Sequence, residues 1–217
     1  MAAYFNQAFV DFFKGLAANN ERDWFHDNKK VYEKEVKQPF NQLVNDLIDR
    51  TGADLLAKNA VFRINRDIRF SKDKSPYKLH VGANISDGGR KNMGIPGLYV
   101  HMSAEEQWIG GGMYMPDKDS LLKIRNAIID NPAKWESMLK NKHFKKIYDT
   151  IQGDRNKVLP KELKERAGDN EWVYNKQFYF MAKYQDQSIP LRDDLLDFIM
   201  DHNEAGKEFN SFFKSVL

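Results

Sequence analysis

The chain has 217 residues, of which 41% are hydrophobic, 13% aromatic and 30% charged, and its net charge at pH 7 is +3. This composition indicates a packed interior, and the length suits one globular domain over residues 1–217. The absence of cysteine excludes disulfides and thiolate metal sites. No apolar run approaches the ~20 residues of a membrane span, and the N-terminus has no signal-peptide pattern, so we expect a cytoplasmic protein without a membrane partner.

The first fifty residues predict helices. Apolar residues recur at helical spacing over residues 4–17, which indicates an amphipathic helix with Asn6 as a candidate cap. A second apolar stripe over residues 24–48 predicts a long helix. Pro39 lies inside this stripe and has no backbone N–H, so we expect a kink or a break near Val36–Lys37.

Residues 62–85, FRINRDIRFSKDKSPYKLHVGANI, concentrate charge and strand character. Apolar and polar residues alternate over residues 62–70 and again over residues 77–85, which is the period of a strand with one buried face. The SKDKSP between them is typical of a loop, so the segment is predicted to form a hairpin. Arg66 falls on the apolar side of its strand, and we therefore expect a carboxylate or backbone carbonyls to receive its side chain.

Three further strands are predicted at residues 98–103, 107–113 and 177–184. The second of these contains three consecutive glycines at positions 110–112, which weaken a strand, so either a ligand or a helix backbone should approach closely there. Helical spacing returns in the C-terminal residues. The predicted fold is therefore α+β: an antiparallel sheet of about five strands with N- and C-terminal helices packed on it.

Four stretches of the sequence carry a family resemblance. FRINRDIRFSKDKSPYK resembles the signature of the "domain of unknown function 2461" family, which occurs in bacteria and fungi. The opening NNERDWFHDNK, the middle YVHMSAEEQWIGGGMYMPDKDSLLKIR and the late segment Lys176–Tyr179 are similar to the same family. The resemblance covers nearly the whole chain. It implies a single-domain globular protein, and the family brings no established activity with it.

The predicted hairpin carries a cationic polar face, which indicates a binding site for an anion. Arginine forks suit bidentate binding of phosphate or carboxylate, and lysine adds a point charge. Two acidic residues would orient the cations, and a tyrosine would supply an aromatic wall or a hydroxyl donor. The candidate ligand-binding residues are Arg63, Arg66, Arg69, Lys72, Asp73, Lys74, Tyr77 and Lys78. We therefore predict a cytosolic protein that binds a small anionic ligand, such as a phosphate ester or a carboxylate.

The sequence leaves open whether the protein is an enzyme, and it indicates no cofactor. His80 and His101 come from different predicted strands, and with Asp67 they would form a set able to move protons near neutral pH. Phosphoester hydrolysis or another acid–base reaction would use these three candidate catalytic residues. The alternative is that each histidine is simply packed and hydrogen-bonded. No H-x-H or H-E-x-x-H pattern occurs, so no metal site is predicted.

Two other functions stay open at this point. A nucleic-acid-binding module would use the basic strands to follow a phosphate backbone and the aromatic residues Phe62, Phe70, Tyr77 and Tyr99 to stack bases. The alternation argues against it, because it turns Phe62, Phe70 and Tyr77 toward the core. In a purely structural interpretation, Arg–Asp pairs only hold neighbouring strands in register and no ligand binds.

Overall fold

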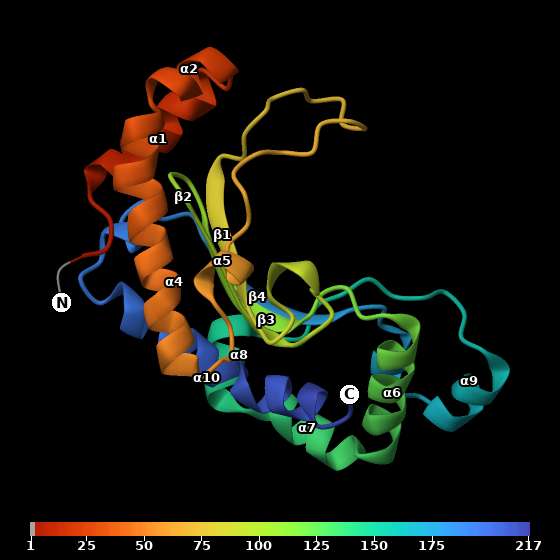
Figure 1. Cartoon of the computed structure of the whole chain (residues 1–217). Coiled ribbons are helices and arrows are strands. Elements are labelled where there is room, and N and C mark those ends of the chain that lie inside the picture. Colours follow the sequence, from red (N-terminus) through yellow and green to blue (C-terminus); the bar gives the residue numbers. More distant parts are fainter. Residues whose placement is uncertain (1–2) are drawn as a thin grey trace.

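The computed structural model describes residues 3–217 and has an α+β architecture, as predicted (Figure 1). Its centre is an antiparallel sheet in the order β1-β2-β3-β4, formed by β1 (His80–Ile85), β2 (Gly97–Ser103), β3 (Gln107–Met113) and β4 (Phe178–Tyr184). The α-helices are α1 (Gln7–Ala18), α2 (Arg22–Asp27), α3 (Lys29–Val31), α4 (Gln38–Thr51), α5 (Ala57–Ala60), α6 (Lys118–Asp130), α7 (Pro132–Lys140), α8 (Lys142–Tyr148), α9 (Lys161–Ala167) and α10 (Leu195–Lys214). A π-helical segment, η1 (Tyr32–Lys37), and three 3₁₀ turns, η2 (Gly89–Lys91), η3 (Glu171–Tyr174) and η4 (Ile189–Leu191), complete the elements.

Helices from both ends of the chain cover one face of the sheet, which is the arrangement that the sequence predicts. The register places Val100 opposite Ala83 on one side and Ile109 on the other, and Ile109 lies opposite Ala182. This row of buried side chains points toward the helices. α4 packs against β1 and α10 packs against β3, and the two helices also contact each other (Figure 1).

The N-terminal helices begin and change geometry close to the predicted positions. Asn6 caps α1, because its side-chain oxygen accepts a hydrogen bond of 2.8 Å from the backbone N–H of Ala8. The interruption expected from Pro39 takes the form of η1, whose π-helical turns end directly before α4. Pro39 is the second residue of α4 and follows η1 without a break in the helical backbone. The wider π-helical hydrogen bonding before it, such as that from Gln38 N–H to the carbonyl oxygen of Glu33, accommodates the N–H that proline lacks.

The expectation of about five strands is wrong, because residues 62–70 do not form a strand. In the described residues, the β-bridges between this region and the chain that follows it are two isolated ones, Val61 with Ala83 and Asn65 with Tyr77. Asp67 accepts a hydrogen bond from the backbone N–H of Arg69, and Asp73 accepts one from the backbone N–H of Ser75. Such local side-chain bonds stabilise turns in place of a ladder between strands. The second half of the predicted hairpin is regular only from His80, where β1 begins.

Within residues 3–217, no helix combines the length and the apolar character that crossing a membrane requires.

Candidate functional site

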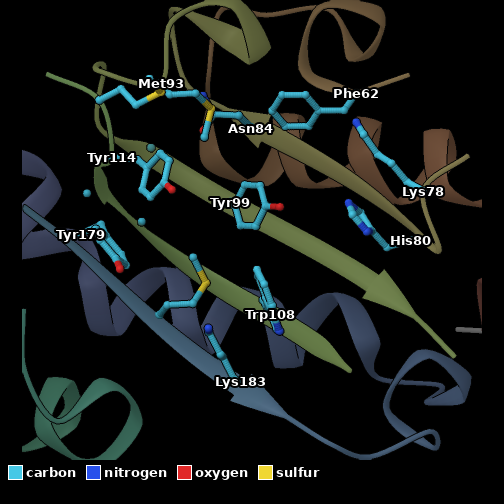
Figure 2. A pocket seen from close by; sticks show the side chains of 15 residues that line it. Phe62, Lys78, His80, Asn84, Met93, Tyr99, Trp108, Tyr114, Tyr179 and Lys183 are labelled. Carbon is cyan, nitrogen blue, oxygen red and sulfur yellow. The ribbon is translucent and has the colours of Figure 1, made fainter. Parts of the chain in front are cut away.

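The face of the sheet that the helices leave open carries aromatic, methionine and basic side chains. The register places Gly82, His101, Trp108 and Lys183 side by side across the four strands. The next row on this face is Asn84, Tyr99, Gly110 and Met181. Because side chains alternate along a strand, these rows point away from the core that Val100 and Ile109 enter. Figure 2 shows this face with its side chains.

A pocket of about 470 Å³ occupies this face (Figure 2). Aromatic rings and thioethers form most of its walls, and three glycines lie in its floor. Its lining residues are Phe62, Lys78, His80, Asn84, Met93, Gly97, Tyr99, Trp108, Gly111, Gly112, Tyr114, Met115, Tyr179, Met181 and Lys183. This volume lies within the range that small-molecule sites usually occupy, about 300–1,000 Å³.

Two lysines lie at the border of the pocket, at opposite edges of the sheet: one is in the edge strand β4 and the other lies just before the edge strand β1. Lys183, in β4, places its Nζ 4.2 Å from the ring centroid of Trp108. Lys78, two residues before β1, places its Nζ 5.4 Å from the ring centroid of Phe62. Burial, together with the nearby positive charge of Arg63, lowers the pKa of Lys78. Among the residues that the structure describes, no aspartate or glutamate lines the pocket, so its charged side chains are both cationic.

A column of stacked rings forms one side of the site. The ring of His101 stacks on that of His80 at a centroid distance of 3.9 Å and on that of Trp108 at 4.5 Å. Burial and the neighbouring Lys78 lower the pKa of His80 to about 4. Burial, followed by the charges of His80 and Lys183, lowers the pKa of His101 to about 3. Both imidazoles are therefore neutral at pH 7 and are weak bases, with a ring nitrogen that can accept a hydrogen bond.

The run of glycines allows neighbouring backbones to approach closely beside the pocket. A side chain at Gly112, whose φ is +86°, would collide with the backbone of β4. The side chain of Asn210, in α10, accepts a hydrogen bond of 2.9 Å from Gly112 N–H and donates one of 3.2 Å to the carbonyl oxygen of Gly97. Asn210 thus ties β2 and β3 together from the helical side of the sheet. On that same side, a side chain at Gly111 would meet the ring of Phe180.

A loop closes the pocket at the end where β2 begins. The carbonyl oxygen of Met93 accepts hydrogen bonds from the backbone N–H groups of Tyr114 at 3.1 Å and Met115 at 3.2 Å. These bonds join the loop before β2 to the segment after β3, and all three side chains line the pocket. Methionine is flexible and polarizable, so this end of the pocket is suited to apolar groups of variable shape.

Most of the predicted anion-binding residues lie outside this pocket, on residues 62–79, which we call the arm. The arm leaves the body of the protein before β1 and extends away from it (Figure 1). Of the eight predicted residues, only Lys78 lines the pocket. Tyr77 is buried at the base of the arm, where its ring stacks on Phe25 at a centroid distance of 4.0 Å. The other six are Arg63, Arg66, Arg69, Lys72, Asp73 and Lys74, and their role in ligand binding stays a prediction.

Local partners engage two of the arm's arginines. Arg66 forms an ion pair with Asp73 and donates a hydrogen bond of 3.1 Å to the carbonyl oxygen of Ser75. A carboxylate and a carbonyl are the partners that the sequence predicts for this side chain. Arg69 binds Asp67 through two side-chain hydrogen bonds of 2.9 and 2.7 Å. Hydrogen bonds from Arg69 lower the pKa of Asp67 to about 2, and those from Ser75, followed by that from Arg66, lower the pKa of Asp73 to about 2.

The structure brings together two of the three candidate catalytic residues. His80 and His101 stack, as described above, and His80 lines the pocket. Asp67 lies on the arm and bonds to Arg69, and within residues 3–217 it makes no hydrogen bond to either histidine. In the same part of the chain, no group of three or more histidine, aspartate or glutamate side chains has an arrangement that would hold a metal ion.

Sequence reasoning missed several residues of the pocket, above all Trp108, Tyr179, Met181 and Lys183. Each lies on the side of its strand opposite to the core residues, and the alternation that predicted the strands also marks them. In β4, for example, Tyr179, Met181 and Lys183 alternate with Phe178, Phe180 and Ala182. Aromatic residues concentrated on the side of the strands that faces away from the core are therefore the signal from which this site could have been predicted.

Comparison with known protein families assigns this chain to one of them. The family described as "conserved hypothetical protein (DUF2461)" matches residues 8–212. The chain belongs to this family. Comparison with curated proteins gives no match.

The four stretches that resemble the DUF2461 family meet at the arm and the pocket. Asn20, from the first stretch, donates a hydrogen bond of 3.0 Å to the carbonyl oxygen of Tyr77 and accepts one of 3.1 Å from its N–H. The second stretch, from Phe62 to Lys78, forms all of the arm except its last residue. The third contributes pocket residues between Tyr99 and Met115, and the fourth ends in Tyr179. Segments far apart in the sequence of this DUF2461 protein thus build one region of the surface.

Proposed function

We propose that the pocket on the open face of the sheet binds a small anionic molecule that also has a flat, apolar part, such as an aryl phosphate or an aromatic carboxylate. One observation carries the proposal. The described residues that line the pocket include two lysines and no carboxylate, and their remaining surface is mainly aromatic rings and thioethers.

The two lysines are the reason to expect a negatively charged ligand. Lys78 is half-buried and has a lowered pKa, which means that its surroundings oppose its positive charge. A bound anion within a few ångströms of Nζ would favour the charged form, and the pKa of Lys78 would rise. Lys183 is exposed, so its attraction is screened by water and salt and is weaker. The ligand's anionic group should therefore lie nearer to Lys78.

The aromatic rings in the pocket are the reason to expect a ligand with a flat, apolar part. Tyr99 stands in the middle of the face with Trp108 beside it, as Figure 2 shows. Burial raises the pKa of Tyr99 to about 12, so its hydroxyl stays protonated and can donate a hydrogen bond to the ligand. An aromatic ring packed on another contributes about 0.5–1.5 kcal/mol beyond the apolar area that it buries.

A hydrolytic reaction is the second candidate, and the position of His80 favours it. His80 lies in the wall of the pocket between Lys78 and His101, where its neutral imidazole can orient an attacking water by accepting a hydrogen bond, although its lowered pKa makes it a weak base. A phosphate ester held by Lys78 would then be the substrate. Binding without turnover is the simpler proposal, because Asp67 does not orient either histidine.

Thermal unfolding with three probes tests the binding proposal. Phenyl phosphate carries both the ring and the charge, inorganic phosphate carries only the charge, and phenol carries only the ring. At about ten times its Kd, phenyl phosphate should raise Tm by roughly 3–6 °C, because ligand binding to the folded form stabilises a chain of this size by that much. At equal concentration the other two probes should raise it less. Equal shifts for phenyl phosphate and inorganic phosphate, or none for any probe, would count against the proposal.

The release of nitrophenolate from 4-nitrophenyl phosphate tests the second candidate. Hydrolysis that His80→Gln abolishes while the Kd for phenyl phosphate stays unchanged would support it. Binding of phenyl phosphate together with no release of nitrophenolate would leave the protein as a binding protein and reject hydrolysis of this ester class.

A further inference from the structure

The arm is an ordered projection. Near its base, the backbone N–H of Lys78 donates a hydrogen bond of 2.9 Å to the carbonyl oxygen of Ile64. Farther out, the N–H of Arg66 donates one of 2.9 Å to the carbonyl oxygen of Pro76. Tyr77 is anchored to the body through Phe25 and Asn20, as described above. These contacts hold the arm in a defined conformation, and its outer part extends away from the sheet (Figure 1).

The arm carries an excess of positive charge. Its sequence contains six lysine and arginine residues and two aspartates, a net charge of +4. Each aspartate is engaged by an arginine, Asp67 by Arg69 and Asp73 by Arg66. The amino group of Lys74 donates to the carbonyl oxygen of Ile68, which leaves its charge uncompensated. The exposed cations beyond the two ion pairs are Arg63, Lys72 and Lys74.

A phenylalanine projects into solvent among these cations. The side chain of Phe70 is 96% exposed, so it contributes nothing to the core. The guanidinium carbon of Arg69 lies 5.9 Å from the centroid of its ring. The alternation in the sequence placed Phe70 in the core and argued against nucleic acid on that ground. The structure removes this objection for Phe70, although it keeps Tyr77 buried.

We propose that the arm binds single-stranded nucleic acid, with phosphates against Arg63, Lys72 and Lys74 and one unpaired base stacked on Phe70. Every base has a π face, and stacking on an aromatic side chain contributes about 1–3 kcal/mol per base. A duplex does not offer such a face, because its bases are stacked on one another. An anionic membrane would need more apolar area than this arm presents, since Ile68 beside Phe70 is half-buried.

Fluorescence anisotropy with a labelled oligothymidylate of about ten nucleotides measures this binding. Between about 50 and 200 mM salt, three or four phosphate contacts predict a log–log slope of roughly −2 to −3 for Kobs against salt. Phe70→Ala should weaken binding by about five- to 150-fold without changing this slope. Phe70→Trp should retain affinity and Phe70→Leu should lose it, because leucine keeps an apolar side chain but removes the ring.

The charge is tested by Lys72→Gln combined with Lys74→Gln. Loss of two phosphate contacts should reduce the size of the slope by about 1.4. The matched control is Lys145→Gln with Lys146→Gln, two exposed lysines of α8, which should change neither affinity nor slope. Equal affinity for a duplex of the same length, a Phe70→Leu variant that binds like wild type, or binding to phosphatidylserine vesicles without binding to the oligonucleotide would overturn the proposal.

A variant of the pocket distinguishes nucleic-acid binding by the arm from ligand binding in the pocket. Lys183→Met should leave binding of the oligonucleotide unchanged while it weakens binding of phenyl phosphate. Failure of the arm to bind oligothymidylate would overturn the inference about the arm and would not affect the result for phenyl phosphate.

Discussion

Replacing the pocket lysines by methionine tests the role of charge in ligand binding most directly. Methionine keeps an apolar side chain of similar length, so the wall of the pocket is retained while the positive charge is lost. Two unit charges ~4 Å apart attract by about 1 kcal/mol in water and by about 4 kcal/mol in surroundings of effective dielectric constant 20. Lys183 is exposed, so its attraction to an anion lies near the lower of these values, whereas Lys78 is half-buried and its attraction is stronger.

We expect Lys183→Met to weaken binding of phenyl phosphate by about 1 kcal/mol, which is roughly fivefold in Kd. Lys78→Met should cost about 2 kcal/mol, or roughly thirtyfold. Isothermal titration calorimetry of each variant with phenyl phosphate and with phenol measures both values. Phenol carries no charge at pH 7, so its affinity should change little in either variant.

A third lysine near an aromatic ring, Lys134, provides the matched control. The Nζ of Lys134 lies 5.5 Å from the ring centroid of Phe212, close to the 5.4 Å between Lys78 and Phe62, but Lys134 does not line the pocket. Lys134→Met should leave the Kd for phenyl phosphate unchanged. If it weakened binding as much as Lys183→Met, or if phenol lost as much affinity as phenyl phosphate, the electrostatic reasoning would be refuted.

Two further predictions concern stability. A methyl group at Gly206, in α10, would overlap the ring of Phe180, so Gly206→Ala should lower the free energy of unfolding by about 1–2 kcal/mol even though alanine favours helix. Adding Phe180→Leu should give a double variant that is more stable than the sum of the two single effects predicts, and strict additivity in chemical denaturation would argue against this contact. Burial lowers the pKa of His80 from 6.5 to about 4, so the unfolded chain takes up this proton first and the folded state loses stability as pH falls through that range. Urea unfolding measures this between about pH 6 and pH 4.5. Over this range the free energy of unfolding of His80→Gln should fall less steeply than that of wild type, by about 1.4 kcal/mol per pH unit. An equally steep fall in the two proteins would contradict the lowered pKa of His80.

Local patterns in the sequence determined much of the fold. Asn6 can cap a helix because its side chain needs only the backbone N–H two residues later. Alternation predicted the strands that become β2, β3 and β4, because each has one face on an apolar core. The same alternation failed over residues 62–70. There the hydrogen bonds of Asp67 and Asp73 to nearby backbone groups produced turns that a two-residue period does not reveal.

The location of the candidate site was decided by tertiary structure. The charge cluster was visible in the sequence, and it proved to lie mostly on a projecting arm, with Lys78 alone of the eight predicted ligand-binding residues lining the pocket. Trp108 and Lys183 are 75 residues apart in the chain and become neighbours only through the register of β3 with β4. Sequence alternation thus specifies which face a side chain occupies. Pairing of strands across long intervening segments specifies its neighbours, because that pairing depends on how the helices pack against the sheet.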